Sequence, residues 1–566
     1  MVGAEPDRFV TAAAAAVVKP RATGGTTGLA RTTKVFWAAF ALMALLTTMW
    51  SLASPIFSVP DENAHATKAI AQVRGQVLGY QVEGVKHTVV DLPPEYSYSQ
   101  TIVCYLFAPE IPANCGFELG GDGGADWFPT WVSAYNPLYY YAVGWPSLIL
   151  DGSAGIYGMR IISGLLCAAF AGLAFQVAMS VRRSRWMPLG LAFVFTPMIT
   201  YFFGSVNPNG LEIASAAALW VSLLRLLQHF DGRDAGTVSS LSRRYLWFVV
   251  SISSIVLVTA RSLGPLWLVL VVLLCFLACG WHPVKRLFTT PASYVGLAFI
   301  AAGGIFSIVW TLSGGSLSGQ AEASDAPLVG ATFLQGFAHT LRTTPDYLLQ
   351  AIGFFGWLDT PLPVHVYWLF VAAFGLLALL AVATAGRRSL VTLAGIIGAA
   401  IFVPALVQGY SVGQTGIIWQ GRYGLFLYVG VAIFAAWVLS GRDGRRVAYL
   451  APRVTALAGS LLAVYAAFAF LLVLKRYVVG RGHPISLMFS DPTWQPPLGW
   501  IALASVFVLT TAAFAVWCVR LSVTPVEDDT TGVVDARAVS SGRAGSVPAA
   551  SEAQAERLAP RELTHG

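Results

Sequence analysis

The chain has 566 residues, of which 56% are apolar and only 11% are charged, and its mean hydropathy is +0.66. A soluble globular protein carries about 25% charged residues, so this composition excludes one. The net charge of +7 is spread over short Lys and Arg clusters, without a basic stripe interleaved with aromatics, which argues against nucleic-acid binding. The apolar residues form runs of about 20, the length of a membrane-spanning helix.

Residues 1–34 are rich in Ala, Thr and Gly, and we expect a disordered cytoplasmic N-terminus there. The first apolar run, 35–57, is longer than the hydrophobic part of a signal peptide, so we predict an uncleaved span. Eleven further spans are predicted at 155–181, 186–205, 211–229, 245–261, 264–280, 293–312, 364–385, 389–409, 423–440, 453–475 and 499–519. The expected fold is therefore an all-α polytopic membrane protein with about 12 transmembrane helices.

Lys and Arg cluster in alternate short loops, which is typical of loops on the cytoplasmic side. This pattern predicts a bacterial cytoplasmic (inner) membrane protein with both termini inside the cell. Residues 58–154 then form a long first extracytoplasmic loop with interfacial helices, and residues 313–363 and 476–498 lie on the same side. Residues 521–566 have few apolar side chains, and we expect a disordered cytoplasmic tail.

Two cysteines of the first loop, Cys104 and Cys115, are expected to form an extracytoplasmic disulfide. Cys275 and Cys279 lie within an apolar run at a spacing that also suits metal binding. Because no His or third thiol accompanies them, we interpret them as packing residues.

The most informative stretch follows the first span, where Pro60 precedes Asp61, Glu62 and His65. Proline suits the first turn of a helix, and on a helix Asp61 and His65 share one face with Glu62 beside them. Two carboxylates and an imidazole would then converge at the membrane surface as catalytic groups. The alternative is that the acids only complement the helix dipole. A zinc site is a weaker alternative, because the pattern lacks a second histidine.

A second candidate lies at the outer mouth of the tenth span, where Arg422 stands between Gln420 and Tyr423. A cation at an outer helix end is disfavoured by topology, and a fixed guanidinium there could bind a phosphate with two hydrogen bonds. Arg160, at the outer start of the second span, suggests the same role. The alternative for both arginines is snorkelling at the interface.

These stretches occur in a recognisable order, with Asn136-Pro137-Leu138-Tyr139-Tyr140 and Gly356-Trp357-Leu358-Asp359 between them. Together, over about residues 35–520, they resemble the domain-of-unknown-function 2142 family of bacterial membrane proteins. That family is similar to GT-C glycosyltransferases, which take sugars from polyprenyl-phosphate donors and use an acid in the first outer loop. The resemblance implies a GT-C-like transmembrane domain and places Asp61 at that acid. The chain departs from the family pattern at Asn209, where an acid is expected, and at Gly424, where a bulkier residue is expected.

The function implied is transfer of a sugar, with inversion, from a polyprenyl phosphate in the bilayer to a glycan, lipid or protein acceptor of the cell envelope. No phosphate-binding G-x-x-x-x-G-K-[ST] motif appears, so direct use of a nucleotide is not supported. A divalent cation stays possible, because an Asp-Glu pair suits one. The main alternative is a transporter or flippase of a lipid-linked saccharide, and a non-catalytic scaffold is the third. Glu212, Arg225 and Arg261 fall toward predicted span ends, which favours surface chemistry over transport.

Overall fold

The computed structural model describes residues 24–98, 104–115, 119–120, 127–181, 184–231, 241–315, 326–441 and 443–523. All of them belong to one compact unit, Met1–Val526. The disorder expected at the two ends falls mostly outside the described residues. It is wrong for residues 24–34, because helix α1 (Gly24–Ala53) already begins there. The helix begins before the apolar part of the span, although Gly and Thr, which are poor helix formers, make up most of residues 24–34.

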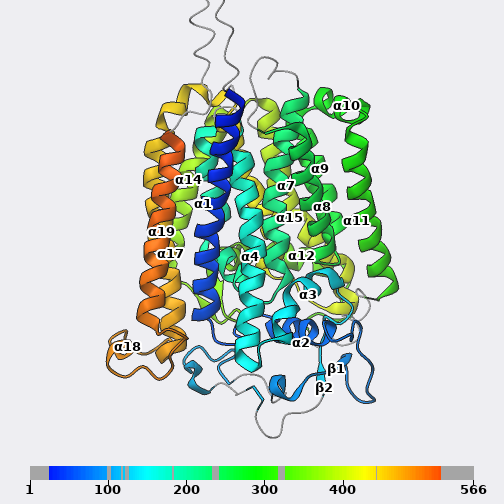
Figure 1. The fold of residues 1–566 in the computed structure, drawn as a ribbon, viewed down its shortest axis with the longest axis vertical. Helices are drawn as coiled ribbons and strands as arrows, with labels where there is room; N and C mark the ends of the chain where they lie inside the picture. Colours follow the sequence, from blue (N-terminus) through cyan, green and yellow to red (C-terminus); the bar gives the residue numbers. More distant parts are fainter. Residues whose placement is uncertain are drawn as a thin grey trace, which may run out of the picture. The chain divides into compact units, whose positions relative to one another are not determined.

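The predicted all-α polytopic fold is confirmed. Ten helices of the described residues are long and apolar enough to cross a membrane. They are α1, α4 (Gly152–Ala178), α7 (Pro208–Phe230), α8 (Arg243–Ala260), α11 (Ser293–Ser313), α14 (Val364–Thr384), α15 (Arg387–Thr415), α16 (Leu425–Leu439), α17 (Ala451–Val479) and α19 (Trp500–Val523). Short 3-10 turns, η5 (Gly421–Gly424) and η6 (Asp443–Leu450), lead into α16 and α17. In Figure 1 most of these helices run side by side along the vertical axis.

Two further predicted spans are bent. The turn η4 (Ser184–Trp186) and α5 (Met187–Val194) lead into α6 (Pro197–Phe203) at 65°, and α9 (Gly264–Cys279) meets α10 (Trp281–Thr289) at 118°. Proline at the start of α6 has no backbone N–H to donate to α5, so the helix must restart there. Counting each bent pair as one span gives up to 12 spans, which agrees with the predicted number.

The segments between spans gather largely at one end of the helices, which we call the loop end (Figure 1). It carries α2 (Glu62–Gln72), α3 (Pro137–Gly144), α18 (Leu487–Ser490) and a two-stranded antiparallel sheet of β1 (Val89–Asp91) and β2 (Trp127–Pro129). The same loops contain the turns η1 (Pro94–Tyr96), η2 (Ala113–Cys115) and η3 (Trp145–Leu148). The expected disulfide is formed, with the Cα atoms of Cys104 and Cys115 6.0 Å apart.

The segment predicted as a second outer loop, 313–363, contains α12 (Phe333–Arg342), α13 (Thr344–Gly353) and a small hairpin of β3 (Phe354–Phe355) and β4 (Thr360–Pro361). Two spans also run further than predicted. Helix α15 continues from the expected end at 409 to Thr415, and α17 continues from 475 to Val479. Charge ended the predicted α17, but Arg476 is buried and bonds to loop carbonyls, so the helix continues.

Helix α1 packs along α4 and α19, which fixes where the chain leaves the first span. Near the end of α1, the Trp50 indole N–H donates to the Thr200 hydroxyl at 3.1 Å. The Trp50 ring also packs against Phe470 and Phe355, with ring centroids 4.8 and 5.4 Å away. These contacts anchor the start of the segment that carries Asp61.

Candidate active site

The chain turns sharply between α1 and α2, and Asp61 stands at the end of that turn. Phe57 and Asp61 both adopt the left-handed conformation, with φ of 64° in each case. This conformation costs a non-glycine residue of the order of 1–3 kcal/mol and tends to occur at functional sites. Asp61 is the N-cap of α2, yet its side chain accepts no capping hydrogen bond. The carboxylate is therefore available for another partner.

That partner is Arg422, from η5. Its Nη2 bonds to Asp61 Oδ2 and to the Tyr423 hydroxyl at 3.0 Å, and its Nη1 donates to the carbonyl of Pro60 at 3.2 Å. The Asp61 side chain keeps 25% of its surface exposed, whereas the Arg422 side chain keeps 2%. The structure thus brings together the two predicted segments, with the carboxylate as the more open member of the pair.

The charge state of Asp61 follows from its neighbours. Burial raises the pKa of the carboxyl, but the nearby Arg422, His65 and Arg261 outweigh it, so the pKa lies below its ordinary value. Asp61 is therefore ionised at neutral pH. An ionised carboxylate can accept a hydrogen bond from an incoming hydroxyl, and its proton as a new bond forms.

His65 lies one turn further along α2, on the same face as Asp61. Its Nδ1 is 2.8 Å from the Tyr140 hydroxyl. Burial lowers the pKa of His65 to about 3, although the Asp61 carboxylate acts in the opposite sense. The imidazole is therefore neutral at physiological pH and joins Asp61 to α3 through Tyr140.

The Glu62 carboxylate differs from that of Asp61 in its partners and its burial. Its carboxylate bonds to Arg160, with Nε 2.7 Å from Oε1 and Nη2 2.5 Å from Oε2. The backbone N–H groups of Phe57 and Val206 donate to the same two oxygens, at 3.1 and 3.0 Å. Both side chains of the pair are 0% exposed. Glu62 is therefore sealed away from substrate.

Arg160 also differs from expectation. Besides Glu62, its Nη1 donates to the carbonyls of Ser51 at 2.8 Å and Ser54 at 2.6 Å, and its Nη2 donates to that of Pro55 at 2.8 Å. All five N–H groups of the guanidinium are thus used within the protein. No donor is left for a phosphate, so Arg160 holds the end of α1 rather than the substrate.

Gln420 and Tyr423 flank Arg422 and behave differently. Gln420 is the N-cap of η5, and its Oε1 is buried without a hydrogen-bond partner among the described residues. Tyr423 is half-buried, and its hydroxyl touches Arg422 while its ring lies 4.5 Å from the guanidinium of Arg261. Tyr423 therefore connects two cations.

Arg261, the residue after α8, is the main member of the site that we did not predict. Its guanidinium lies over the ring of Tyr423 and, at 5.9 Å, over that of Tyr135. It also helps to lower the pKa of Asp61. The argument that selected Arg422, a cation at an outer span end, applies equally to Arg261 and could have identified it.

A cavity of about 450 Å³ adjoins these groups. Arg261, Tyr423, Tyr135 and Glu212 line it, together with the last turns of α15 and the segment before η5. Glu212 also accounts for the missing acid at position 209. The amide of Asn209 donates to Glu212 Oε2 at 3.1 Å, so a carboxylate is present one turn later on the same helix face.

A fourth arginine holds the disulfide-closed loop against the same region. Arg476 donates to the carbonyls of Tyr105 at 2.5 Å and Ile111 at 3.1 Å, and lies 3.4 Å from the Asp359 carboxylate. The Tyr105 hydroxyl in turn donates to the carbonyl of Ile56 at 2.7 Å, next to the left-handed Phe57. The loop therefore buttresses the turn that presents Asp61.

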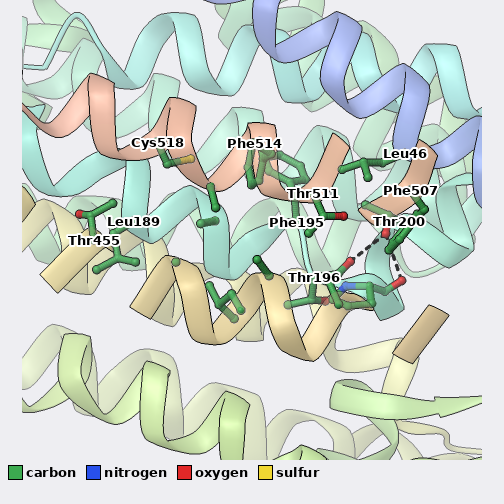
Figure 2. A pocket seen from close by; sticks show the side chains of 17 residues that line it. Leu46, Leu189, Phe195, Thr196, Thr200, Thr455, Phe507, Thr511, Phe514 and Cys518 are labelled. Carbon is green, nitrogen blue, oxygen red and sulfur yellow. Dashed lines mark hydrogen bonds between the residues drawn. The ribbon is translucent and has the colours of Figure 1, made fainter. Parts of the chain in front are cut away.

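A second cavity, of about 40 Å³, lies among the spans (Figure 2). Its lining is apolar apart from hydroxyls such as Thr455 and Thr511, and it contains no charged residue. A volume of this size holds at most a few waters. Within the described ranges, no group of three or more His, Cys, Asp and Glu side chains is placed to hold a metal ion.

Comparison with known proteins gives a family and two structures. A family model described as "Predicted membrane protein (DUF2142)" matches residues 40–431, more than half of the chain. No curated protein matches. The structure of ArnT from Cupriavidus metallidurans in the apo state is similar with a TM-score of 0.41 and 12% identity, covering 85% of this chain and 75% of that one. ArnT from the same organism bound to undecaprenyl phosphate gives a TM-score of 0.39 and 13% identity, covering 85% and 76%.

Proposed function

The chain belongs to the DUF2142 family of predicted membrane proteins, and from the Asp61–Arg422 pair we propose that it is a membrane glycosyltransferase of the GT-C type. It transfers a sugar from a polyprenyl-phosphate donor to a cell-envelope glycan or glycoconjugate acceptor. One observation carries the proposal. A partly exposed carboxylate and a guanidinium 361 positions away in the sequence meet at the loop end, next to a cavity lined by a second cation.

Asp61 is the proposed base. An acceptor hydroxyl donates a hydrogen bond to the carboxylate, and its oxygen attacks the anomeric carbon of the donor sugar. The low pKa keeps the carboxylate ionised and able to accept the proton, which the hydroxyl gives up as the new C–O bond forms. The proton passes to Asp61 and then to water. A single displacement of this kind inverts the anomeric configuration.

Arg422 and Arg261 are the proposed stabilisers of the leaving group. As the bond from the anomeric carbon to the phosphate oxygen breaks, its electron pair moves to the phosphate. Two guanidiniums on either side of Tyr423 place positive charge where this negative charge develops. The polyprenyl phosphate is a good leaving group once it is stabilised in this way, so no general acid is required.

The remaining predicted residues have supporting roles in this proposal. Tyr423 keeps the two guanidiniums apart and orients Arg422 through its hydroxyl. His65 stays neutral and fixes the first turn of α2, and Gln420 offers its unpartnered Oε1 to a ligand. Glu62 and Arg160 are positioning residues that hold α2 against α1 and α4. Glu62 is therefore not a second candidate for the base.

The reaction is placed on the extracytoplasmic side of a bacterial cytoplasmic membrane, with both chain termini in the cytoplasm. This placement rests on the basic clusters of the alternate short loops. Asp61, Arg422 and the disulfide then share the oxidising side, where a structural disulfide persists.

A flippase for a lipid-linked saccharide is the second candidate, and one observation favours it. The span made of α5 and α6 is broken by 65°, and interrupted spans are common at transport sites. A flippase moves the lipid and leaves its sugar attached. Transfer and movement can therefore be measured separately on the same protein.

The test uses the full chain in liposomes with a radiolabelled polyprenyl-phosphate sugar and an envelope-glycan acceptor. Wild type should transfer label, and Asp61→Asn and Arg422→Ala should each lose about 10²–10³-fold or more in rate while remaining folded. Asp491→Asn, the same change at an exposed aspartate, is the matched control. Normal transfer by Asp61→Asn would defeat the assigned base. Movement of the labelled lipid between leaflets without transfer would establish the flippase instead.

A further inference from the structure

One carboxylate oxygen at the cavity makes no hydrogen bond of ordinary geometry within the part of the chain that the structure describes. Glu212 lies near the start of α7 and is 2% exposed. Its Oε2 accepts from the Asn209 amide, but its Oε1 has no hydrogen bond of ordinary geometry among the described residues, although the Trp267 indole stands close enough to interact with the carboxylate. Buried carboxylate oxygens are normally hydrogen-bonded, because burial without a partner is unfavourable. Since Glu212 lines the cavity, a molecule bound there can supply the missing donor.

The walls of the same cavity suit a sugar ring. Trp419 is buried, and its indole N–H also lacks a partner within the described part of the chain. Four more aromatic side chains line the cavity: Tyr135, Trp267, Tyr410 and Tyr423. Aromatic faces bind the C–H face of a sugar, while an indole N–H and a carboxylate bind its hydroxyls. The volume of about 450 Å³ is ample for one ring.

The charges around the cavity restrict which sugar fits. Two of the ionisable side chains here are acids, Asp61 and Glu212, and two are arginines, Arg422 and Arg261, so acids and bases balance in number. The phosphodiester of a donor adds one negative charge. A uronic acid would add a second one in a site of low dielectric, directly against Glu212, where like charges repel strongly. A sugar without charge avoids this repulsion and offers its hydroxyls to Glu212.

We propose that the cavity is the subsite for the transferred sugar, and that Glu212 Oε1 accepts a hydrogen bond from a hydroxyl of an uncharged sugar. This inference rests on the proposed glycosyltransferase function and adds the class of donor to it. Arg261 holds the phosphate at the edge of the subsite, between Tyr423 and Tyr135. Glu212 then distinguishes a sugar-bearing lipid from the bare polyprenyl phosphate.

The experiment measures binding of lipids to the purified full chain in nanodiscs. The probes are undecaprenyl phosphate and undecaprenyl-phosphate sugars in matched pairs, namely glucose and glucuronic acid, galactose and galacturonic acid, and mannose and mannuronic acid. In at least one pair the neutral sugar should bind about 10-fold or more tightly than its uronic acid. Glu212→Gln should lower the preference for that neutral ligand over undecaprenyl phosphate about 10-fold, because the altered contact is to the sugar, which the bare lipid lacks.

Three further variants complete the test. Trp419→Phe removes the indole N–H and leaves a smaller aromatic ring, and it should weaken the sugar lipid by a smaller factor. This variant tests the subsite independently if Glu212→Gln fails to fold. Glu83→Gln, at an exposed loop position, is the matched control and should bind all probes as wild type does. Arg261→Ala should weaken every probe, including the bare lipid.

The outcomes separate the inference from the proposed function. If wild type transfers sugar but Glu212→Gln and Trp419→Phe bind every sugar lipid normally, the subsite is wrong and the glycosyltransferase stands. Equal or tighter binding of the uronic acid in all three pairs overturns the neutral-sugar assignment. If wild type neither binds nor transfers any of these lipids, the proposed function fails, and the subsite assignment fails with it.

Discussion

Two adjacent acids, Asp61 and Glu62, each bind an arginine from a distant part of the chain, and the two pairs differ in every other respect. Glu62 and Arg160 are 0% exposed, and every N–H of that arginine is used by the protein. Asp61 is 25% exposed. Its partner Arg422 has a buried Nε without a hydrogen bond among the described residues.

The contrast between the two ion pairs shows how one turn of chain can combine a fixed backbone with a reactive side chain. A sealed, fully bonded ion pair fixes the position of a backbone segment, but it cannot act on a substrate. A partly exposed, open pair such as Asp61–Arg422 can interact with a substrate, but other contacts in the protein must fix its geometry. Because Asp61 and Glu62 are joined by one peptide bond, the Glu62–Arg160 pair enforces the position of Asp61. The predictions below test this division of roles.

Breaking the fully buried Glu62–Arg160 pair, which we call the sealed pair, should have the largest effect on stability. Arg160→Ala leaves the Glu62 carboxylate buried without its counter-charge, which destabilises a protein by about 3–5 kcal/mol. Since total stabilities are about 5–15 kcal/mol, little folded protein should remain. Thermal unfolding in detergent and the yield of monodisperse protein measure this.

The control for that prediction is Arg422→Ala, which breaks the open pair. Its partner Asp61 can reach water, so the unfolding temperature should fall much less than in Arg160→Ala. Equal destabilisation by the two variants would contradict the distinction between the pairs.

The disulfide should have the next largest effect, because it closes the loop that Arg476 holds against the Asp61 turn. Replacing Cys104 and Cys115 by Ser removes a cross-link between residues 11 positions apart. The unfolded chain then gains conformational freedom, and the free energy of unfolding should fall by about 3 kcal/mol. In the transfer assay kcat should fall while KM stays near the wild-type value, because the turn loosens and the cavity does not. Replacing Cys167, a free buried cysteine, by Ala is the comparison. A change in KM alone would place the loop in substrate binding instead.

The sequence predicted the larger features because they depend on simple physical signals. Runs of apolar residues located the ten spans among the described residues, and the number predicted is reached if each of the two bent pairs is one span. The family match confirms the resemblance drawn from the ordered motifs. The pairing of Asp61 with Arg422 could not be derived from either motif, since no local pattern relates positions 361 residues apart. The disulfide of Cys104 and Cys115 followed from their shared polar loop.

What the sequence could not reveal was which charged groups the protein itself satisfies. Arg160 and Arg422 look alike at outer span ends, but only tertiary contacts show that carbonyls of the α1 end saturate Arg160. The extension of α17 through Arg476 was missed for the same reason, because its carbonyl partners lie about 370 positions away. Arg261 was missed although its position carried the same signal as Arg422.

A conservative change at the open pair should have an intermediate effect. Arg422→Lys keeps the positive charge beside Asp61 but loses the planar fork that also reaches Pro60 and Tyr423. The rate of transfer should fall about 10- to 100-fold, with little change in unfolding temperature. The corresponding change at the sealed pair, Arg160→Lys, should instead lower stability and leave kcat per folded molecule nearly unchanged. The reverse pattern would exchange the roles of the two pairs.

The smallest effect concerns His65, which stands beside the open pair but is itself buried. Its pKa is lowered to about 3 in the folded protein, from about 6.5 when unfolded. Between these values the unfolded chain binds one more proton than the folded chain. The stability contributed by neutral His65 is therefore complete above about pH 6.5 and is lost as pH falls toward 3.

Between pH 7 and 5.5 this linkage should lower the free energy of unfolding by about 1 kcal/mol. The window isolates His65 from its charged neighbours. Burial lowers the pKa of Lys68 to about 7, so its linkage lies mainly above the window, and Asp61 titrates below it. His65→Asn keeps a group that can meet the Tyr140 hydroxyl but does not titrate, so it should flatten the slope, whereas His87→Asn in the outer loop should retain most of it. An unchanged slope in His65→Asn would mean that the imidazole is protonated as readily in the folded protein as in the unfolded chain, and that it does not support Asp61 as a neutral neighbour.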